Sequence, residues 1–365
     1  MQTLIRWIIA AALVVGSCSL SARDYQIETV ADGLAYPWSL AFLPDRSMLV
    51  TERPGRLRMI VNGQLQEQAI SGVPAVYAAS QGGLFEVLPD PDFADNRLLY
   101  LSFAHGTPQS NATRVVRARL DGMRLVDLEV LFTARPNKDT PVHYGGRMIF
   151  LPDGTLLIGL GDGFDYREQA QRLDSHLGTI VRIHRDGSVP DDNPFVGTED
   201  ALPEIYSYGH RNVQGLALDA ESGTIWQHEH GPRGGDEINI IEPGKNYGWP
   251  VATTGIDYSG AIISPYESRP GMVDPLLTWT PSIAPSGLAL YRGAMFPAWQ
   301  GDLFATALAG RELRRVDLEN GEIAGQETLL ESLAERLRDV RTGPDGALYV
   351  LTDADPGKVL RLKPR

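Results

Sequence analysis

A segment of 45 residues, from Tyr206 to Pro250, concentrates residue types that can do chemistry. It reads YSYGHRNVQGLALD, then HEHGPRGGDEINII, then KNYGWP. Arg211 is a permanently charged fork suited to planar oxygen groups, and Asn212 and Gln214 can hydrogen-bond the same group. The Gly231-Pro232 pair is a turn signal that can expose main-chain carbonyl oxygens, which hard cations prefer. The segment therefore predicts a site that binds an anion and a hard cation together.

A histidine and an aspartate form a second candidate site. His143 lies in PVHYGGRM and Asp162 in GLGDG, on either side of a Pro152-Asp153-Gly154 turn. Antiparallel pairing around this turn would place residue 146 opposite residue 160, and hence His143 near Asp162 and Gly163. A carboxylate beside an imidazole is the arrangement that a general base needs, because it fixes the ring tautomer and stabilises the imidazolium. The alternative is a surface histidine beside a turn aspartate.

These residues belong to a repeated unit that occurs six times. Each copy consists of an apolar strand, a turn of the Pro-Asp-Gly type and a second strand of alternating polarity. The copies contain the segments WSLAFLPDRSMLVTER, GGLFEVLPDPDFADNRLLYLSF, GGRMIFLPDGTLLIGLGDG, VQGLALDAESGTIWQHE, PSGLALYRG with a delayed GDLFATAL, and RDVRTGPDGALYVLTD. From Leu40 to Val340 there are five intervals over 300 residues, so the average unit has 60 residues.

A unit of this length can hold a four-stranded sheet with its connections. The sequence therefore predicts an all-β fold, namely a six-bladed β-propeller of four-stranded antiparallel blades, formed as a single domain by residues 23–365. A pair of β-sandwiches would give no reason for six similar hairpins. Three longer segments, 104–142, 164–205 and 253–279, are predicted to build the rim of the central channel and to select the substrate.

Residues 1–22 have the layout of a signal peptide. Arg6 is their only charge, an apolar run extends from Trp7 to Val15, and small residues close the segment at Ala22. The run is too short for a permanent membrane anchor. Cys18 is the only cysteine, which excludes an internal disulfide, and it also ends a passable lipoprotein cleavage site. We expect a periplasmic or secreted protein, with release after Ala22 favoured over a lipid anchor on Cys18.

The formal net charge is −13, and removal of Arg6 with the signal segment leaves −14. A surface of this sign repels nucleic acids and acidic polymers and suits neutral small molecules. We therefore expect no nucleic acid among the partners. The sequence does not determine the oligomeric state, for which a monomer is favoured.

The motifs resemble those of the soluble quinoprotein glucose and aldose sugar dehydrogenases. The resemblance extends through all six repeats and rests mainly on GHRNVQG, EHGPRGGDEIN and HYGGR. It implies that aldose sugars are oxidised at C1 to lactones and that a hydride passes to pyrroloquinoline quinone (PQQ), which is held with Ca2+. Such a reaction needs a cofactor, because side chains cannot accept a hydride. GLGDG closes a hairpin and does not open a helix, so it is no dinucleotide fingerprint, and no CxxCH haem motif occurs.

By resemblance, His143 is the catalytic base, Asp162 is its partner, and Arg211 stabilises the negative charge that develops on the quinone oxygen. An RxR pair in the last repeat matches a pair of arginines at the cofactor, and its spacing places both on one strand face. The alternatives are a solvated edge for this pair and an ordinary loop amide for Gln81. The predicted cofactor-binding residues are Gln81, Arg211, Asn212, Gln214, Arg311, Arg336 and Arg338.

The resemblance assigns Ca2+ to two places. The carbonyl groups of Gly231 and Pro232 match ligands of the ion that contacts PQQ. Glu237 and the carbonyl group of Tyr247 match a second, structural ion site of the aldose branch. Asp236 is ambiguous, and the alternative for these acids is a capping or turn role.

Three positions depart from the family pattern. Ala309 stands where relatives have a lysine against the quinone, and we expect Arg311 to supply this charge instead. Val142 precedes the histidine where glucose-oxidising relatives have an aspartate, and His230 stands where some have a glutamine. These differences favour the broader aldose branch over a glucose-specific enzyme.

Two other functions compete with this interpretation. A Ca2+-dependent propeller lactonase or other hydrolase would need a metal held mainly by acidic and amide side chains, whereas the sequence supplies arginines around the channel. A non-catalytic binding propeller would leave His143 and Asp162 without a joint purpose. We therefore expect a sugar dehydrogenase that passes electrons to an unidentified acceptor.

Overall fold

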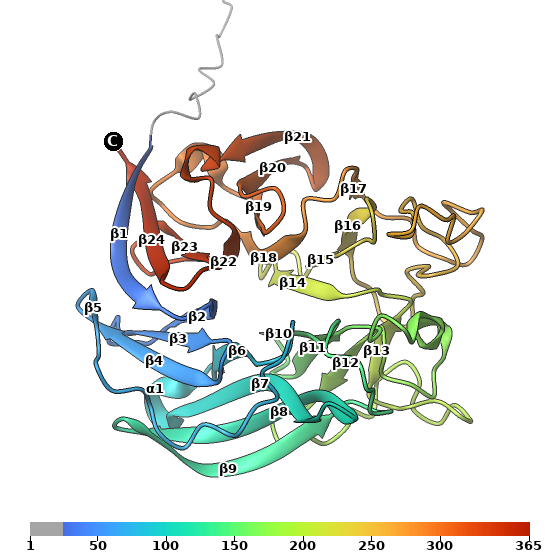
Figure 1. Ribbon diagram of the computed structural model, residues 1–365, viewed down its shortest axis with the longest axis horizontal. Helices are drawn as coiled ribbons and strands as arrows, with labels where there is room; N and C mark the ends of the chain where they lie inside the picture. Colours follow the sequence, from blue (N-terminus) through green and yellow to red (C-terminus); the bar gives the residue numbers. More distant parts are fainter. Residues whose placement is uncertain (1–24) are drawn as a thin grey trace, which may run out of the picture.

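The chain folds into a ring of six four-stranded antiparallel sheets, which the computed structural model describes over residues 25–365 (Figure 1). The prediction of an all-β, six-bladed propeller is confirmed. The predicted signal segment, residues 1–22 with Cys18, lies outside the described residues. Within the described part, no helix has the length and apolar character needed to cross a membrane.

The strands of each blade follow one another from the channel outwards. Blade 1 consists of β2 (Pro37–Phe42), β3 (Met48–Glu52), β4 (Arg56–Val61) and β5 (Gln64–Leu65). Blade 2 consists of β6 (Leu84–Pro89), β7 (Leu98–Thr107), β8 (Ser110–Asp121) and β9 (Arg124–Thr133). Blade 3 consists of β10 (Gly145–Phe150), β11 (Leu156–Leu160), β12 (Thr179–Ile183) and β13 (Ile205–Tyr208). Blade 4 consists of β14 (Val213–Leu218), β15 (Ile225–Glu229), β16 (Asp236–Ile240) and β17 (Leu277–Trp279). Blade 5 consists of β18 (Pro285–Leu290), β19 (Leu303–Ala307), β20 (Leu313–Glu319) and β21 (Glu322–Leu329). Blade 6 consists of β22 (Leu337–Thr342), β23 (Leu348–Thr352), β24 (Gly357–Pro364) and β1 (Tyr25–Leu34). The short helices are α1 (Phe93–Asn96), η1 (Arg167–Gln171), η2 (Pro297–Trp299) and η3 (Glu331–Leu333).

The ring is closed by the two ends of the described chain. β1 pairs antiparallel with β24, so the first strand completes the last blade (Figure 1). Consecutive inner strands contact one another all round the ring. Apolar side chains fill the space between neighbouring sheets, as Leu49, Leu84 and Leu101 do between blades 1 and 2. Closure buries a face of every sheet, which explains why one hairpin pattern recurs six times.

The predicted Pro-Asp-Gly turn is stabilised by its own aspartate. In blade 3, Asp153 Oδ1 accepts hydrogen bonds from the Thr155 amide at 2.9 Å and from the Thr155 hydroxyl at 2.6 Å. Gly154 has a φ of 81°, a left-handed conformation that favours glycine. Asp45 and Asp345 accept equivalent bonds in blades 1 and 6. The turn is therefore encoded locally, within four residues.

Every inner strand has a β-bulge near its start. In blade 3 the pairing is regular up to Met148 and Ile158, and then shifts so that Gly145 faces Leu160. The predicted pairing of residue 146 with about residue 160 thus agrees with the structure to within one position. Gly145 and Gly146 have φ values of 67° and 104°, which admit the extra residue because glycine lacks a Cβ.

One of the three predicted rim insertions is mostly part of a blade. Segment 104–142 contains the end of β7 and all of β8 and β9, which have 10, 12 and 10 residues, so only 134–142 form a connection. The prediction is wrong there because three consecutive strands of this blade have 10 residues or more, whereas most strands of the other blades are shorter. Segments 164–205 and 253–279 are mostly loops, as predicted.

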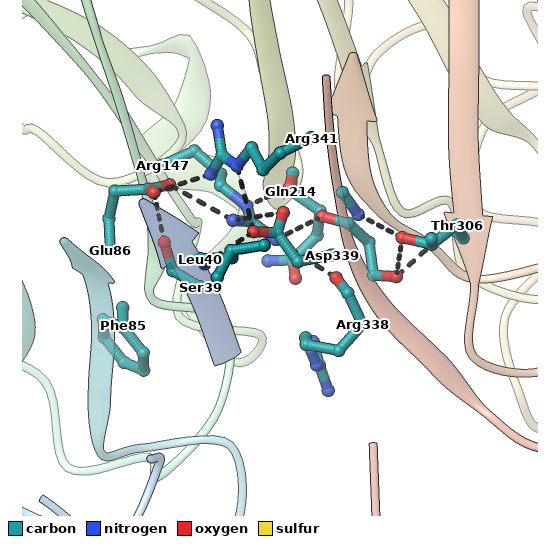
Figure 2. A network of polar contacts seen from close by, with 12 residues as sticks. Ser39, Leu40, Phe85, Glu86, Arg147, Gln214, Thr306, Arg338, Asp339 and Arg341 are labelled. Carbon is teal, nitrogen blue, oxygen red and sulfur yellow. Dashed lines mark hydrogen bonds and ion pairs between the residues drawn. The ribbon is translucent and has the colours of Figure 1, made fainter. Parts of the chain in front are cut away.

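A buried arginine lies across the channel and joins the inner strands (Figure 2). Arg147 of β10 donates to the main-chain oxygens of Gln214, Ser286 and Arg338 at 2.8, 3.0 and 3.2 Å. These acceptors lie on β14, β18 and β22. One guanidinium group therefore ties blade 3 to blades 4, 5 and 6.

The same guanidinium group also reaches blades 1 and 2. Arg147 pairs with Glu86 of β6 at 3.2 Å and with Asp339 of β22 at 3.0 Å. Its central carbon lies 4.0 Å from the ring centroid of Trp38 on β2. Arg341 pairs with the same two carboxylates at 2.6 and 3.0 Å (Figure 2). We call Glu86, Arg147, Asp339 and Arg341 the hub.

The hub divides the channel between two cavities. Arg338 lines a cavity at the starts of the inner strands, whereas Arg341, three residues further along β22, lines a cavity of about 410 Å3 at their ends. Glu86 also lines this far cavity. The candidate site described next lies wholly on the near side.

Candidate active site

Two cavities lie at the mouth formed by the starts of the inner strands. The first has a volume of about 290 Å3, and its wall contains the three residues predicted to be catalytic: His143, Asp162 and Arg211. The second has a volume of about 110 Å3, and its wall contains four of the residues predicted to bind the cofactor: Gln81, Gln214, Arg336 and Arg338. The fold thus gathers residues that lie more than 250 positions apart in the sequence.

The first cavity contains a buried histidine–carboxylate pair. His143 Nδ1 lies 2.7 Å from Asp162 Oδ1, so the predicted proximity is observed. Asp162 also accepts hydrogen bonds from the Phe164 amide and from Trp249 Nε1, each at 2.8 Å. An ionised carboxylate only accepts hydrogen bonds, so His143 donates from Nδ1 and its basic lone pair lies on Nε2. This is the tautomer that a general base requires.

The charges around this pair favour a neutral imidazole. Burial lowers the pKa of His143 below its usual value, and Arg211 and Lys138 lower it further, while Asp162 opposes the shift. Burial acts to raise the pKa of Asp162, but the charges of His143 and Arg211 outweigh it, and the pKa of this carboxyl is lowered. Near neutral pH, a neutral histidine therefore faces an ionised aspartate.

Arg211 lines the same cavity. Its Nη1 atom donates to the main-chain oxygens of His230 at 3.0 Å and Gly231 at 2.7 Å. Its guanidinium carbon lies 5.2 Å from the ring centroid of Trp249. Its Nε atom is buried without a hydrogen-bond partner among the described residues. A buried donor without an acceptor is costly, so this atom favours an anionic ligand in the cavity.

Gln214 lines the second cavity, whereas Asn212 is buried and lines neither cavity wall. Asn212 Oδ1 accepts hydrogen bonds from the Gly145 amide at 3.2 Å and from Gln214 Nε2 at 3.3 Å. Gln81 Oε1 accepts a bond from the His143 amide at 2.9 Å, which connects the wall of the second cavity to the base. These amides hold the backbone of blade 3 against blades 2 and 4.

The second cavity is positively charged. Arg336 and Arg338 both pair with Asp353, at 2.9 and 3.3 Å, and Arg53 lines the same wall. The prediction that the RxR pair shares one face agrees with this arrangement. Burial lowers the pKa of Arg338, and neighbouring arginines, including Arg53 and Arg336, add to this effect. Three guanidinium groups beside one carboxylate fit a ligand that carries carboxylates.

Arg311 does not contribute to either cavity wall. It is exposed, and its Nη1 atom donates to the main-chain oxygen of Ala334 at 3.5 Å. Arg311 has a φ of 53° in a turn, and its place outside both walls gives no support to the expected replacement of the missing lysine. His230, by contrast, lines the second cavity, where Nε2 lies 2.7 Å from the main-chain oxygen of Pro285.

The GPRGGDE segment forms a tight loop against the first cavity. Pro232 lines its wall, and the Gly231 oxygen is held by Arg211. A Cβ at Gly231 would lie 2.2 Å from the carbonyl carbon of Gly235, so only glycine fits there. Asp236 accepts bonds from the Gly231 amide at 2.8 Å and from Ser282, Ile283 and Ala284, and thus fixes the loop.

Two buried acids face each other behind this loop. Glu237 pairs with Glu229 in the register of β15 and β16. Burial and the charge of Glu229 hold the pKa of Glu237 well above its usual value. Tyr247 packs its ring on His210, with centroids 4.7 Å apart, and anchors the adjoining KNYGW turn. Glu229 is already held by His210 Nδ1 at 2.8 Å and by the Arg211 amide at 2.7 Å, so Glu237 is the carboxyl group that a proton or a cation such as Ca2+ would have to neutralise.

The rim of the first cavity is aromatic. Phe164 and Tyr258 stack with their ring centroids 6.2 Å apart, and the edge of Phe164 meets the His143 ring at 5.2 Å. Both side chains are substantially exposed, with Tyr258 at 58%. They come from segments 164–205 and 253–279, which agrees with the predicted role of these segments in the rim.

Several residues of the site were not predicted. Trp249 carried a signal, since it lies in the KNYGWP motif, but its hydrogen bond to Asp162 spans 87 positions. Arg147 lies in the HYGGR motif and Arg53 ends the first repeat, but neither pattern indicated that these side chains or Lys138 would lie at the channel, because whether a charged residue is buried depends on contacts between blades.

A sequence profile of the glucose/sorbosone dehydrogenase family matches residues 34–361. The chain belongs to this family. It is 44% identical over 345 residues to the aldose sugar dehydrogenase YliI of Escherichia coli strain K12, and the match covers 93% of each chain. A crystal structure of a glucose dehydrogenase has a TM-score of 0.90 at 49% identity and covers 92% of this chain and 99% of that one.

A third relative was solved with the cofactor. The PQQ-bound form of an aldose sugar dehydrogenase from Streptomyces coelicolor has a TM-score of 0.78 at 30% identity, covering 93% of this chain and 98% of that one. The family member described here is therefore an oxidoreductase of the quinoprotein type, as predicted.

Proposed function

We propose that this family member oxidises aldose sugars at C1 to lactones, with PQQ and Ca2+ as cofactors and His143 as the general base. The observation that carries the proposal is the buried His143–Asp162 pair, which shares a cavity with Arg211. The PQQ-bound relative supports the choice of cofactor.

In this proposal His143 Nε2 accepts the proton of the C1 hydroxyl group. Asp162 keeps Nδ1 protonated through the bond at 2.7 Å and stabilises the imidazolium that forms. PQQ, when bound, supplies the electron acceptor that takes the hydride from C1. Trp249 and the Phe164 amide hold Asp162 in place, and the aromatic rim limits access of water to the reacting carbon.

The residues that would hold PQQ come from both cavities. Arg336 and Arg338, with Arg53, suit its carboxylates. Arg211 suits the quinone oxygens, because its buried Nε atom has no partner among the described residues. Asn212, Gln214 and Gln81 would add neutral donors and acceptors.

Calcium is proposed at two places. The Gly231 oxygen already accepts one bond from Arg211, but a carbonyl oxygen has two lone pairs and can also coordinate a cation, as can that of Pro232. Glu237, with Glu229 opposite and the carbonyl group of Tyr247, would hold a second, structural ion. In the described part of the chain, no group of three or more acidic, histidine or cysteine side chains is arranged so that it could hold a metal ion, so main-chain ligands are essential to both proposals.

The remaining expectations stay proposals. The physiological electron acceptor is unidentified, a monomer is favoured, and export to the periplasm or the exterior rests on residues 1–22. A hydrolase and a binding propeller are the competing functions, and neither uses the arginines and the base together.

The proposal is tested by reconstitution. Protein prepared without cofactor is titrated with PQQ in the presence and absence of Ca2+, and aldose oxidation is followed with a dye acceptor. His143→Ala should retain PQQ affinity and lose about 10²–10⁴-fold in kcat. Arg211→Ala should lose both affinity and kcat.

Two exposed residues supply matched controls, His184→Ala and Arg119→Ala; among the described residues Arg119 is paired only with the exposed Asp127, and both variants should behave as the unaltered protein. Sugar oxidation by His143→Ala at the unaltered rate, with PQQ saturating, would refute the mechanism. Absence of oxidation in the unaltered protein with both cofactors would refute the function.

A further inference from the structure

Lys138 is a buried lysine beneath the catalytic pair. Its exposed fraction is 3%, and it lies in the connection between β9 and β10. Its Nζ atom donates to Asn111 Oδ1 at 3.1 Å and to the main-chain oxygen of Thr140 at 2.5 Å. The same atom lies 3.5 Å from the ring centroid of Tyr144. A fully buried lysine is rare unless its charge is needed nearby, so its surroundings call for an explanation.

The lysine is tied to both residues of the pair through the backbone. Its bond to Thr140 holds the segment 138–143, which ends at His143. The Thr140 hydroxyl donates to the main-chain oxygen of Gly163 at 2.6 Å, next to Asp162. A Cβ on Gly163 would lie 2.7 Å from Lys138 Cδ, so the lysine stem occupies the space that this glycine leaves open.

Burial and the neighbouring carboxylates act on the protonation of Lys138 in opposite directions. Asp162 and Asp139 are the carboxylates that favour its protonated form, whereas burial opposes it and lowers the pKa of Lys138 to about 7. His143 is faced by Asp162, Arg211 and Lys138, and its charge acts in turn on His230. Asp162 is thus the shared neighbour of a buried imidazole and a buried ammonium group.

We propose that Lys138 is a positioning residue for the catalytic pair: its ammonium group braces segment 138–143 and places a positive charge beside the buried carboxylate of Asp162. This charge disfavours a second positive charge on His143. Below about pH 7 the lysine is protonated, so it keeps the histidine neutral in the range where the base would otherwise be lost to protonation. The proposal rests on the proposed role of His143.

Two measurements test it on the full chain. The pKa of His143 is measured by NMR titration of 13C-labelled histidine, with His143→Gln for assignment. The kcat/KM for aldose oxidation is measured from about pH 5.5 to about pH 8.5 with PQQ and Ca2+. Lys138→Met should raise the pKa of His143 and lower kcat/KM at the acid end by at least about threefold more than at the alkaline end. Lys138→Arg keeps the positive charge, so it should restore kcat/KM at the acid end of the pH range.

A second variant covers the case in which Lys138→Met does not fold. Asn111→Asp puts a carboxylate 3.1 Å from the ammonium group with little change of shape, and should raise the pKa of His143 in the same direction. The control is Lys363→Met, which removes a surface lysine paired with Glu28 and should change neither quantity.

An unchanged His143 titration in both Lys138→Met and Asn111→Asp would overturn the proposal. So would an equal loss of kcat/KM at every pH in Lys138→Met. The NMR titration needs no turnover, so it stays decisive even if the proposed sugar oxidation fails.

Discussion

The charge of Asp162 can be removed with almost no change of shape by the substitution Asp162→Asn. The carboxylate accepts three hydrogen bonds, from His143, Phe164 and Trp249. An amide offers one acceptor oxygen and one NH2 group, so in either orientation at least one of these donors faces another donor. The substitution also removes the charge that stabilises the imidazolium.

The expected loss follows from these contacts. A hydrogen bond to a charged group contributes about 1.5–3 kcal/mol, which corresponds to a decrease in kcat of about 10- to 150-fold. Asp162 raises the pKa of His143, so its neutralisation should lower that pKa and move the acid limb of the rate profile to lower pH. For Asp162→Asn, the maximum rate therefore falls, while the decline of the rate on the acid side moves to lower pH. Lys138→Met is expected to move this decline in the opposite direction, to higher pH.

The assay is dye-linked aldose oxidation by protein saturated with PQQ and Ca2+, measured across the pH range. Denaturant unfolding of the same samples shows whether the variant is folded. A kcat within twofold of the unaltered protein would refute the reasoning, because the bond at 2.7 Å would then contribute nothing to the base.

Two further predictions concern stability. Arg147→Met leaves Glu86 and Asp339 buried with only Arg341 as a cation, and should lower the free energy of unfolding by about 3–5 kcal/mol in urea titrations; a loss below about 1 kcal/mol would contradict the hub. Burial lowers the pKa of His228 from 6.5 to about 4, so its contribution is present above pH 6.5 and is lost as the pH falls toward 4. The free energy of unfolding should therefore be lower by about 2 kcal/mol at about pH 5 than at pH 7.5. His228→Gln should remove this part of the pH dependence, and an unaltered pH dependence in the variant would contradict the role given to His228.

The fold was predictable because its signals are local and repeated. A turn such as that at Asp153 is stabilised within four residues and recurs at Asp45 and Asp345, and the six copies of the strand-turn-strand pattern favour a six-bladed propeller. The register at the start of β10 was not predictable to the residue, because the bulge at Gly145 depends on the meeting of inner strands. The strands of blade 2 were mistaken for an insertion because their length is not set by the turn signal.

The site was predictable where motif and topology act together. The hairpin placed His143 beside Asp162, and the six repeats brought the last-blade arginines to the same mouth. The exposed position of Arg311, outside both cavity walls, was not predicted, because a positive charge does not fix where a turn residue lies. Lys138 and Arg147 were missed because burial of a cation follows from the packing of several blades.

The hub also bears on the route by which a substrate reaches the catalytic pair. Within residues 25–365 it fills the axis between the near and far cavities, so a molecule that enters from the far side meets Glu86 and Arg341 before any residue of the catalytic pair. Under the proposed activity, the sugar therefore reaches His143 from the near side of the hub, past Phe164 and Tyr258, and the lactone leaves by that side as well.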